Sequence, residues 1–313
     1  MTASGPPRSV VLLGPQRRPS VQHVVRELGL DAPLAAINAG WRERETDDGE
    51  LRELLGGRTV NLALYSRWLD VHERDREYGH AEREHEAALD ELRRLYLTQL
   101  EHALRAAYDV ASGTEGRPRL RGSALTDAVE VVRLVDRQHV ARVRAAEAAF
   151  DAAWRPGERP AVTAHREEVR RLLGEAEALA VAGGHVGDLA RVLRLFDVEP
   201  HLPRGVVAWS AGAMALCERI VLFHDFVAHG VAQTEVLGDG LGLVPGLVAL
   251  PHARRRLRTN DPVRMSVLAR RFAPARCLVL DDAVALRLAA DGGLPADARL
   301  VREDGAIAQV SAA

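Results

Sequence analysis

Short apolar runs alternate with amphipathic segments over the first part of the chain. The runs, each of which predicts a buried strand, lie at 9–14, 34–39 and 60–65. Apolar residues at helical spacing follow the first run and end at Gly29, and a second short helix is expected around 51–55. This alternation predicts a flavodoxin-like α/β fold, in which a mostly parallel sheet carries helices on both faces.

The pattern changes after residue 66. Over 67–155 Gly and Pro are rare, and apolar residues recur at helical spacing on both sides of a Gly- and Pro-rich break at 113–118. We therefore expect a long helical hairpin at 67–155, inserted between two parts of one α/β domain at 1–66 and 156–313. Its apolar stripe packs on the core, on a second subunit, or over the active site as a lid.

The alternation of strands and helices resumes after the hairpin. Runs at 178–182 and 206–209 predict two more buried strands; the first ends at Gly183 and Gly184 and the second at Ser210. Five further runs predict extra strands at one edge of the sheet, at 231–237, 247–250, 277–280, 283–288 and 306–310.

The composition is that of an ordinary globular protein with little net charge. Of the 313 residues, 47% are hydrophobic and 27% are charged, and the formal net charge is −2. This balance gives no electrostatic reason to expect nucleic acid or an anionic membrane as a partner. All 42 basic residues are arginine. Pyridoxal-phosphate enzymes and Walker-type nucleotidases are excluded because both need a lysine.

Cysteine usage and the start of the chain predict a cytoplasmic protein. The two cysteines, Cys217 and Cys277, lie in apolar patterns, so a disulfide framework is not expected. The apolar run near the N-terminus is too short for a signal peptide, and no run reaches the length of a membrane span. We expect neither a membrane nor a cofactor as a partner.

A short strand that ends on a serine, followed at once by small residues, is the most informative chemical feature of the chain. Ser210 follows the run at 206–209, and Ala211, Gly212 and Ala213 open a helical pattern. This is the layout of a nucleophile elbow, in which a sharp strand-to-helix turn presents the serine hydroxyl above the sheet edge. An ordinary strand–helix junction has the same pattern, so the rest of the chain must decide between the two.

A serine nucleophile needs a base within hydrogen-bond reach. His252 is the best placed histidine, because it lies just past the predicted strand at 247–250, at the sheet edge where ligands bind. His224 and His229 lie in a polar segment and are interpreted as surface histidines.

An orienting acid and two oxyanion donors complete such a site. Asp281 and Asp282 directly follow the predicted strand at 277–280, and only one of them can face the histidine; a solvated turn is the alternative interpretation. The amide of Ala211 is one candidate oxyanion donor. The backbone at Gly184, which closes the strand before the elbow strand, is the other.

Together these motifs resemble the aspartyl dipeptidase (peptidase E) and cyanophycinase family of serine peptidases. The resemblance covers about 177–290 and rests on the elbow at 210–213, the Gly-Gly pair before it, and the run Gly-Leu-Gly-Leu-Val-Pro-Gly at 240–246 that leads to His252. It implies a class I glutamine amidotransferase-like fold and cleavage of aspartyl peptide or isopeptide bonds in small substrates.

The resemblance also implies roles for single residues. Ser210 becomes the nucleophile and His252 the base. The amides of Gly184 and Ala211 become the oxyanion donors.

Asp282 is the first choice for the third member of the triad and Asp281 the second.

The chain departs from the family pattern at Ala208, where the elbow usually has glycine, and at His185, where these enzymes commonly carry a polar amide or an acid. His185 is nevertheless a candidate substrate contact.

Arginines cluster directly after His252. Arginine binds carboxylates bidentately, and the resembled family acts on aspartyl substrates. Arg256 or Arg258 is therefore expected to bind a substrate carboxylate, and a solvated arginine-rich turn is the alternative.

Two functions stay open on the sequence. The first is a serine hydrolase that forms an acyl-enzyme on Ser210. The second is a non-catalytic binding or scaffold protein that uses the hairpin as its interaction surface, with a second copy of the chain among the candidate partners.

Other classes are excluded or disfavoured. A glutamine amidotransferase needs a cysteine where Ser210 stands, and an α/β-hydrolase needs a histidine after its acid, whereas none follows Asp282. His80 and Glu84 have a spacing that metal ligands use, but no cysteine or His-x3-His motif supports them. We expect no metal site.

Overall fold

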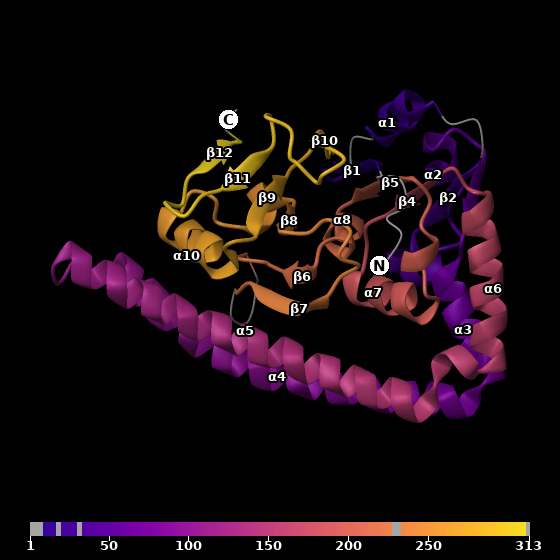
Figure 1. Cartoon of the computed structure of the whole chain (residues 1–313), viewed down its shortest axis with the longest axis horizontal. Helices are drawn as coiled ribbons and strands as arrows, with labels where there is room; N and C mark the ends of the chain where they lie inside the picture. The colour runs from indigo at the N-terminus through magenta and orange to yellow at the C-terminus, as the bar shows by residue number, and fades with distance from the viewer. Residues whose placement is uncertain (1–8, 17–19, 30–32, 227–232, 311–313) are drawn as a thin grey trace.

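A six-stranded sheet forms the centre of the computed structural model, which describes residues 9–16, 20–29, 33–226 and 233–310 (Figure 1). Its strands are β1 (Ser9–Leu13), β2 (Leu34–Ile37), β3 (Thr59–Asn61), β4 (Ala178–Val181), β5 (Gly205–Trp209) and β10 (Ala285–Arg287). The order across the sheet is β10-β1-β5-β4-β2-β3, and all neighbours are parallel except the β10–β1 pair.

Helices cover both faces of this sheet, because successive strand residues point to opposite sides. In β1, Leu12 packs into the larger hydrophobic core, whereas Leu13 packs into a smaller one. The smaller core lies under α1 (Val21–Leu28) and α2 (Gly49–Leu54). The larger core contacts the helices of the other face, which are α3 (Leu64–Arg74), α6 (Pro160–Glu175), α7 (Val186–Leu195) and α8 (Ala211–Leu216). The predicted fold class is thereby confirmed.

A second, four-stranded sheet lies beside the first. It has the order β12-β11-β9-β8 and consists of β8 (Leu247–Pro251), β9 (Arg276–Leu280), β11 (Arg299–Val301) and β12 (Ile307–Gln309). A separate antiparallel pair is formed by β6 (Arg219–Leu222) and β7 (Glu235–Asp239), and the short helix α9 (Ala253–Arg256) and α10 (Pro262–Phe272) follow β8. Only β10 extends the edge of the main sheet, so the expectation that all late strands lie there was wrong.

The hairpin consists of α4 (Arg76–Ser112) and α5 (Pro118–Trp154). Figure 1 shows it running along one side of the body, from α3 and α6 to a tip that extends past α10. The 3-10 segments η1 (Ala39–Arg44), η2 (Pro156–Glu158) and η3 (Glu199–His201) complete the described elements. The division of the chain at residues 66 and 155 stays a prediction.

The third strand is shorter than predicted. Ala63 has a left-handed backbone with φ of 50°, and the Asn61 side chain accepts a hydrogen bond from its amide, so the chain turns before residue 64. The buried Glu45 carboxylate then accepts hydrogen bonds from the backbone amides of Tyr65 and Ser66 in the first turn of α3. These helix-initiating contacts come from distant or polar side chains, which an apolar run at 60–65 does not reveal.

A buried polar cluster fixes the middle of the hairpin to the body. Arg271 on α10 donates to both carboxylate oxygens of Asp136 on α5, at 2.6 and 2.7 Å, and also to the carbonyl of Thr234. Tyr96 on α4 donates to Asp136 at 2.7 Å and accepts the amide of Val236. The Asp136 and Arg271 side chains are 3% and 1% exposed.

Further ion pairs join the hairpin to the body between this cluster and the base of the hairpin. Arg93 pairs with Glu235 and Arg144 pairs with Asp239, both on β7. No helix among the described residues is long and apolar enough to cross a membrane.

Candidate active site

Ser210 occupies a sharp turn between β5 and α8. Its φ of 51° and ψ of −122° lie outside the regions that most non-glycine residues adopt, as a nucleophile elbow requires. The helix that follows packs closely on β4, because a Cβ added at Gly212 would lie 2.2 Å from the Val181 carbonyl oxygen. The strand–turn–helix arrangement predicted from 206–213 is therefore present.

The loop after β4 passes directly beside this turn. A Cβ at Gly183 would lie 2.7 Å from the Ser210 Cβ, and 3.6 Å from the Ala211 amide nitrogen. Gly184 has φ of 122°, and a Cβ there would lie 2.3 Å from the Gly40 carbonyl oxygen. Only glycine fits these two positions, so the backbone of the loop reaches the space next to the serine.

His252 lies close enough to Ser210 to act on its hydroxyl. It follows β8 with φ of 59°, and 3.4 Å separates its Nε2 from the Ser210 Oγ. The His252 amide donates to the carbonyl of Leu280 at 3.1 Å, which ties the turn to the end of β9. This separation is at the long end of the hydrogen-bonding range, as is common before a substrate is bound.

The two candidate acids have different surroundings. Asp281 accepts the amide of Arg254 at 3.0 Å, at the start of α9 directly after His252, and its other oxygen, Oδ2, is buried without a hydrogen bond from any described residue. The Arg254 guanidinium forms an ion pair with Oδ2 at 3.4 Å. Asp282 is exposed. Of the two, Asp281 is thus the one held against the histidine turn.

Of the three candidate substrate contacts, two line a cavity and one does not. Arg256 and His185 line one cavity together with Gly184, whereas the Arg258 guanidinium lies over the ring of Phe226, 5.9 Å from its centre. Desolvation lowers the pKa of the Arg256 guanidinium. No ion pair joins Arg256 to a carboxylate in the described parts of the chain.

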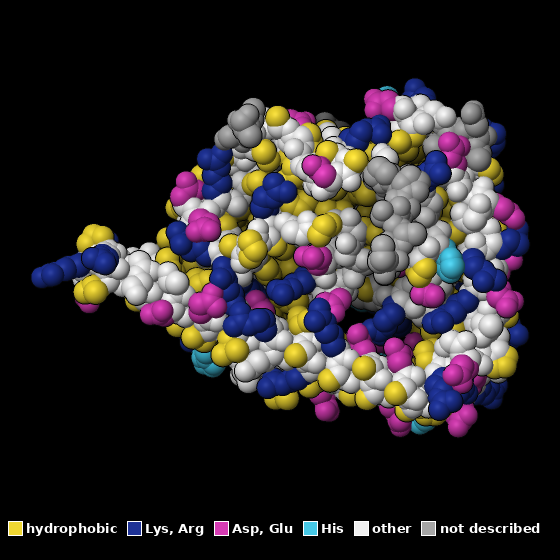
Figure 2. All heavy atoms as spheres, viewed as in Figure 1, with side chains coloured by type: hydrophobic (Ala, Val, Ile, Leu, Met, Phe, Trp, Pro, Cys, Tyr) yellow, Lys and Arg dark blue, Asp and Glu magenta, His cyan; other side chains and the backbone are white. Residues whose placement is uncertain are grey.

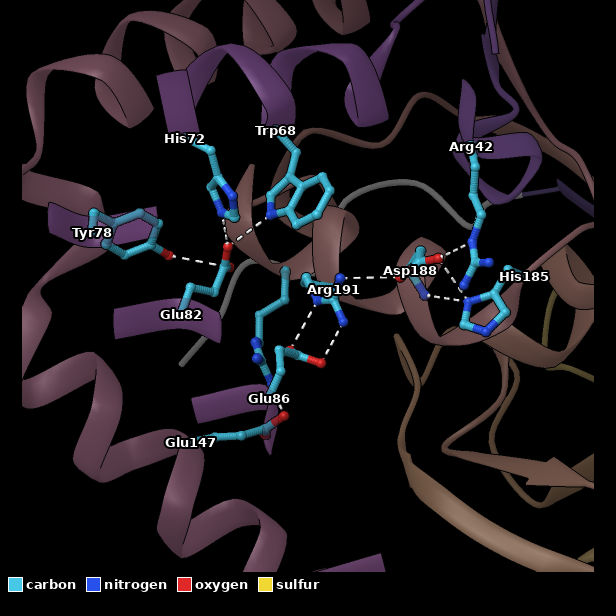
Figure 3. A network of polar contacts seen from close by, with 11 residues as sticks. Arg42, Trp68, His72, Tyr78, Glu82, Glu86, Glu147, His185, Asp188 and Arg191 are labelled. Atoms are coloured by element: carbon cyan, nitrogen blue, oxygen red, sulfur yellow. Dashed lines mark hydrogen bonds and ion pairs between the residues drawn. The ribbon is translucent and has the colours of Figure 1, made fainter. Parts of the chain in front are cut away.

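Figure 3 shows a polar network that holds the loop beside Ser210. Asp188 on α7 pairs with Arg42 of η1, with His185 and with Arg191. Arg191 in turn pairs with Glu86 on α4, so the loop, α7 and the hairpin are connected. The sequence interpretation missed Arg42 and Asp188. The position of Arg42, shortly after the strand at 34–37, is the signal that indicates it, since the ends of parallel strands meet at one edge.

This network makes the Asp188 carboxylate a source of stability that depends on pH. Burial opposes its charge, but the hydrogen bonds from His185 and Arg42 outweigh burial and lower the pKa of Asp188 from 3.8 to about 2. A pKa lowered by folding stabilises the protein above pH 4, and the contribution disappears as the pH falls to about 2.

We expect Asp188→Asn to lower the free energy of unfolding by about 2 kcal/mol at pH 6, and by progressively less between pH 4 and pH 2. Urea denaturation at several pH values measures this. Asp127→Asn, at an exposed hairpin position, is the matched control and should change little at any pH. An Asp188 effect of equal size at pH 6 and pH 2 contradicts the electrostatic explanation.

The remaining candidates for chemistry lie away from the serine or outside the described residues. His224 is exposed, and His229 lies outside the described residues. Burial raises the pKa of Cys217 and that of Cys277 to about 12, so both thiols are protonated near neutral pH. Within the described part of the chain, no group of three His, Cys, Asp or Glu residues is arranged to hold a metal ion.

A serine elbow at the carboxyl end of a mostly parallel sheet, with a histidine of the neighbouring sheet 3.4 Å from its hydroxyl, is the arrangement of a serine hydrolase. The chain belongs to peptidase family S51, whose family model matches residues 137–293. The family resemblance inferred from the motifs is confirmed, and the protein is a serine peptidase that acts on peptide substrates.

One solved structure is also similar to this chain. A crystal structure of a peptidase from an acI-B1 Actinobacterium is similar to this chain at 12% sequence identity and a TM-score of 0.45, over 95% of this chain and 92% of that one. No curated protein matches the sequence.

Proposed function

We propose that the peptidase cleaves its substrates through an acyl-enzyme on Ser210, with His252 as the general base. The observation that carries this proposal is the 3.4 Å separation of Ser210 Oγ and His252 Nε2 at a strained elbow. His252 takes the proton of Oγ as it attacks the scissile carbonyl, and then gives it to the leaving amine. Water attacks the acyl-enzyme with the same histidine as base.

The acid that orients His252 is Asp281 in this proposal. Its buried Oδ2 lacks a hydrogen bond from the described residues, and its Oδ1 is fixed by the amide of Arg254. Asp282, the first choice from the family resemblance, is exposed. An acid that is already anchored beside the histidine turn loses less conformational freedom when it aligns the imidazole ring.

The amides of Ala211 and Gly184 are the proposed donors to the oxyanion. Ala211 is the first residue of α8, so its amide has no partner within the helix. The Gly183 backbone lies next to both Ser210 and the Ala211 amide, which brings the adjoining Gly184 to the same space. Two convergent amides stabilise the tetrahedral intermediate.

Arg256 and His185 are the proposed contacts of an aspartyl side chain in the substrate. Both line the cavity that adjoins the elbow, and Arg256 has no carboxylate partner in the described chain. A guanidinium without a partner binds a carboxylate with charge-assisted hydrogen bonds. Arg258 is left out of this role, since it stacks on Phe226 and does not line the cavity.

Hydrolysis of matched dipeptides tests this specificity. We expect Asp-Leu to be cleaved with a kcat/KM at least about tenfold above that of Asn-Leu, because only the carboxylate pairs with Arg256. Arg256→Gln should remove this preference, whereas the control Arg255→Gln, at an exposed neighbouring position, should keep it. Equal rates for the two dipeptides contradict the assignment of an aspartyl substrate.

A further inference from the structure

A cavity of about 830 Å³ lies between the hairpin and the α/β body. Figure 2 shows the corresponding hollow, with arginine and acidic side chains around its mouth. One wall is formed by α7 and the opposite wall by the hairpin, which contributes Leu89, Asp90 and Val143. The pair β6 and β7 contributes Leu222 and Leu237. The insertion therefore shapes this cavity.

The cavity follows α7 along its whole length. Its lining begins at His185, before the helix, and continues to Asp197 and Glu199, beyond the end of the helix. Because α7 has 10 residues, the cavity is about 15 Å long at the rise of an α-helix. An extended peptide advances about 3.3 Å per residue. This length holds about four residues, which is more than a dipeptide needs.

One end of the cavity adjoins the loop beside Ser210, although Ser210 and His252 are not among its lining residues. Gly184, His185 and Arg256 line it, and the adjoining Gly183 packs against Ser210. A peptide bond held at Ser210 therefore has the rest of its chain directed into the cavity, along α7.

The arrangement of charges gives this peptide a direction. Most arginines of the lining are neutralised, since Arg93 pairs with Glu235, and Arg191 and Arg194 pair with acids of the hairpin. Among the described lining residues, the acids outside any ion pair are Asp90 on the hairpin and Asp197 and Glu199 at the far end, and Arg256 is the cation without a carboxylate at the Ser210 end. A positive peptide terminus fits the far end, because opposite charges then face each other.

We propose that this cavity binds the amino-terminal part of an oligopeptide, with about four residues before the scissile bond and the free amino group near Asp197 and Glu199. The proposal rests on the proposed function, because it takes Ser210 as the place of cleavage. It makes the enzyme an oligopeptidase, whose preference for length comes from the helical insertion.

Binding of a peptide series by calorimetry tests the proposal without turnover. The probes are Asp-Leu and the same dipeptide extended at its amino end by one to four alanines, titrated into the full-length Ser210→Ala variant. We expect the affinity to rise by at least about tenfold over the series. Acetylation of the longest peptide should weaken its binding several-fold, because it removes the amino charge. Equal affinity across the series overturns the proposal, and equal affinity of the acetylated peptide overturns the direction.

A pair of matched substitutions on α4 locates the binding site. Leu89→Trp places an indole in the cavity and should reduce the binding of the longest peptide to that of Asp-Leu, with Asp-Leu itself unchanged. Leu95→Trp introduces the same side chain at a position that is 64% exposed and outside the lining, and should have no effect. Length dependence that survives Leu89→Trp overturns the cavity as the binding site. Failure of the proposed function appears differently, as wild-type protein that binds the series and cleaves none of it.

Discussion

Replacing Ser210 with alanine is expected to lower kcat/KM for peptide hydrolysis by about 10⁴-fold to 10⁶-fold. Without Oγ no acyl-enzyme forms, and only the amides around the elbow and substrate binding remain to assist attack by water. The fold should be unaffected, since among the described residues Oγ forms a hydrogen bond only with His252. Initial rates on Asp-Leu, together with circular dichroism, measure both expectations.

Ser112→Ala is the matched control for this substitution. Ser112 lies at the exposed end of α4, and its hydroxyl bonds only to carbonyls of the same helix. We expect this variant to keep the full rate of hydrolysis. A Ser210→Ala protein that remains folded and cleaves Asp-Leu within tenfold of the wild-type rate contradicts the role of Ser210.

Replacing Asp136 with alanine is expected to lower the free energy of unfolding by about 3–5 kcal/mol. The substitution leaves the Arg271 guanidinium buried without its carboxylate, and it also removes the acceptor of the Tyr96 hydroxyl. Burial by itself lowers the pKa of Arg271, but Asp136 and Tyr96 raise it above its ordinary value. Because a guanidinium keeps its proton in proteins, losing Asp136 leaves a buried cation without its counter-ion. The uncompensated charge destabilises the contact between hairpin and body.

An exposed ion pair on the same hairpin is the control. Arg105 and Glu101 are one helical turn apart with side chains 61% and 30% exposed, so Glu101→Ala should cost less than about 1 kcal/mol. Replacing Asp136 and Arg271 together by leucine and methionine should recover part of the loss, because no charge remains buried. Chemical denaturation of these variants gives the values. A cost for Asp136→Ala no larger than that for Glu101→Ala means that the cluster does not hold the hairpin.

The elements with strong local patterns could be predicted from the sequence. The strands at 34–37 and 178–181 are continuous apolar runs because both of their faces are covered. The hairpin is indicated by apolar residues at helical spacing over long segments on both sides of the break at 113–118. Strands β6 and β11 were missed. Each has only three or four residues, too few for a periodic pattern to indicate a strand.

The candidate site was predictable where chemistry follows a strand end. Ser210 and the glycines before the elbow lie at the carboxyl ends of neighbouring strands of one sheet, so one topological rule brings them together. His252 also follows a strand end, but its strand, β8, belongs to the second sheet. The sequence could not distinguish Asp281 from Asp282. Adjacent residues point to opposite faces, and which of the two faces the histidine depends on the conformation of the turn after β9.

The cavity beyond the site could not be predicted. Its walls combine residues of α4, α5 and α7, of which α4 and α7 are about a hundred positions apart, and no local pattern indicates which of them face one another. The ion pair between Arg191 and Glu86, 105 residues apart, shows how the hairpin is held opposite α7. Arginine side chains such as that of Arg191 thus connect segments that are distant in the sequence.

Intact-mass spectrometry after incubation with a fluorophosphonate tests the central claim most directly, because the reagent modifies only a serine that its surroundings activate. We predict one adduct per chain, located on Ser210 by peptide sequencing, absent from Ser210→Ala and formed far more slowly in His252→Ala. An adduct on a different serine, or an unmodified Ser210 in a preparation that hydrolyses peptides, contradicts the assignment of this elbow as the catalytic centre.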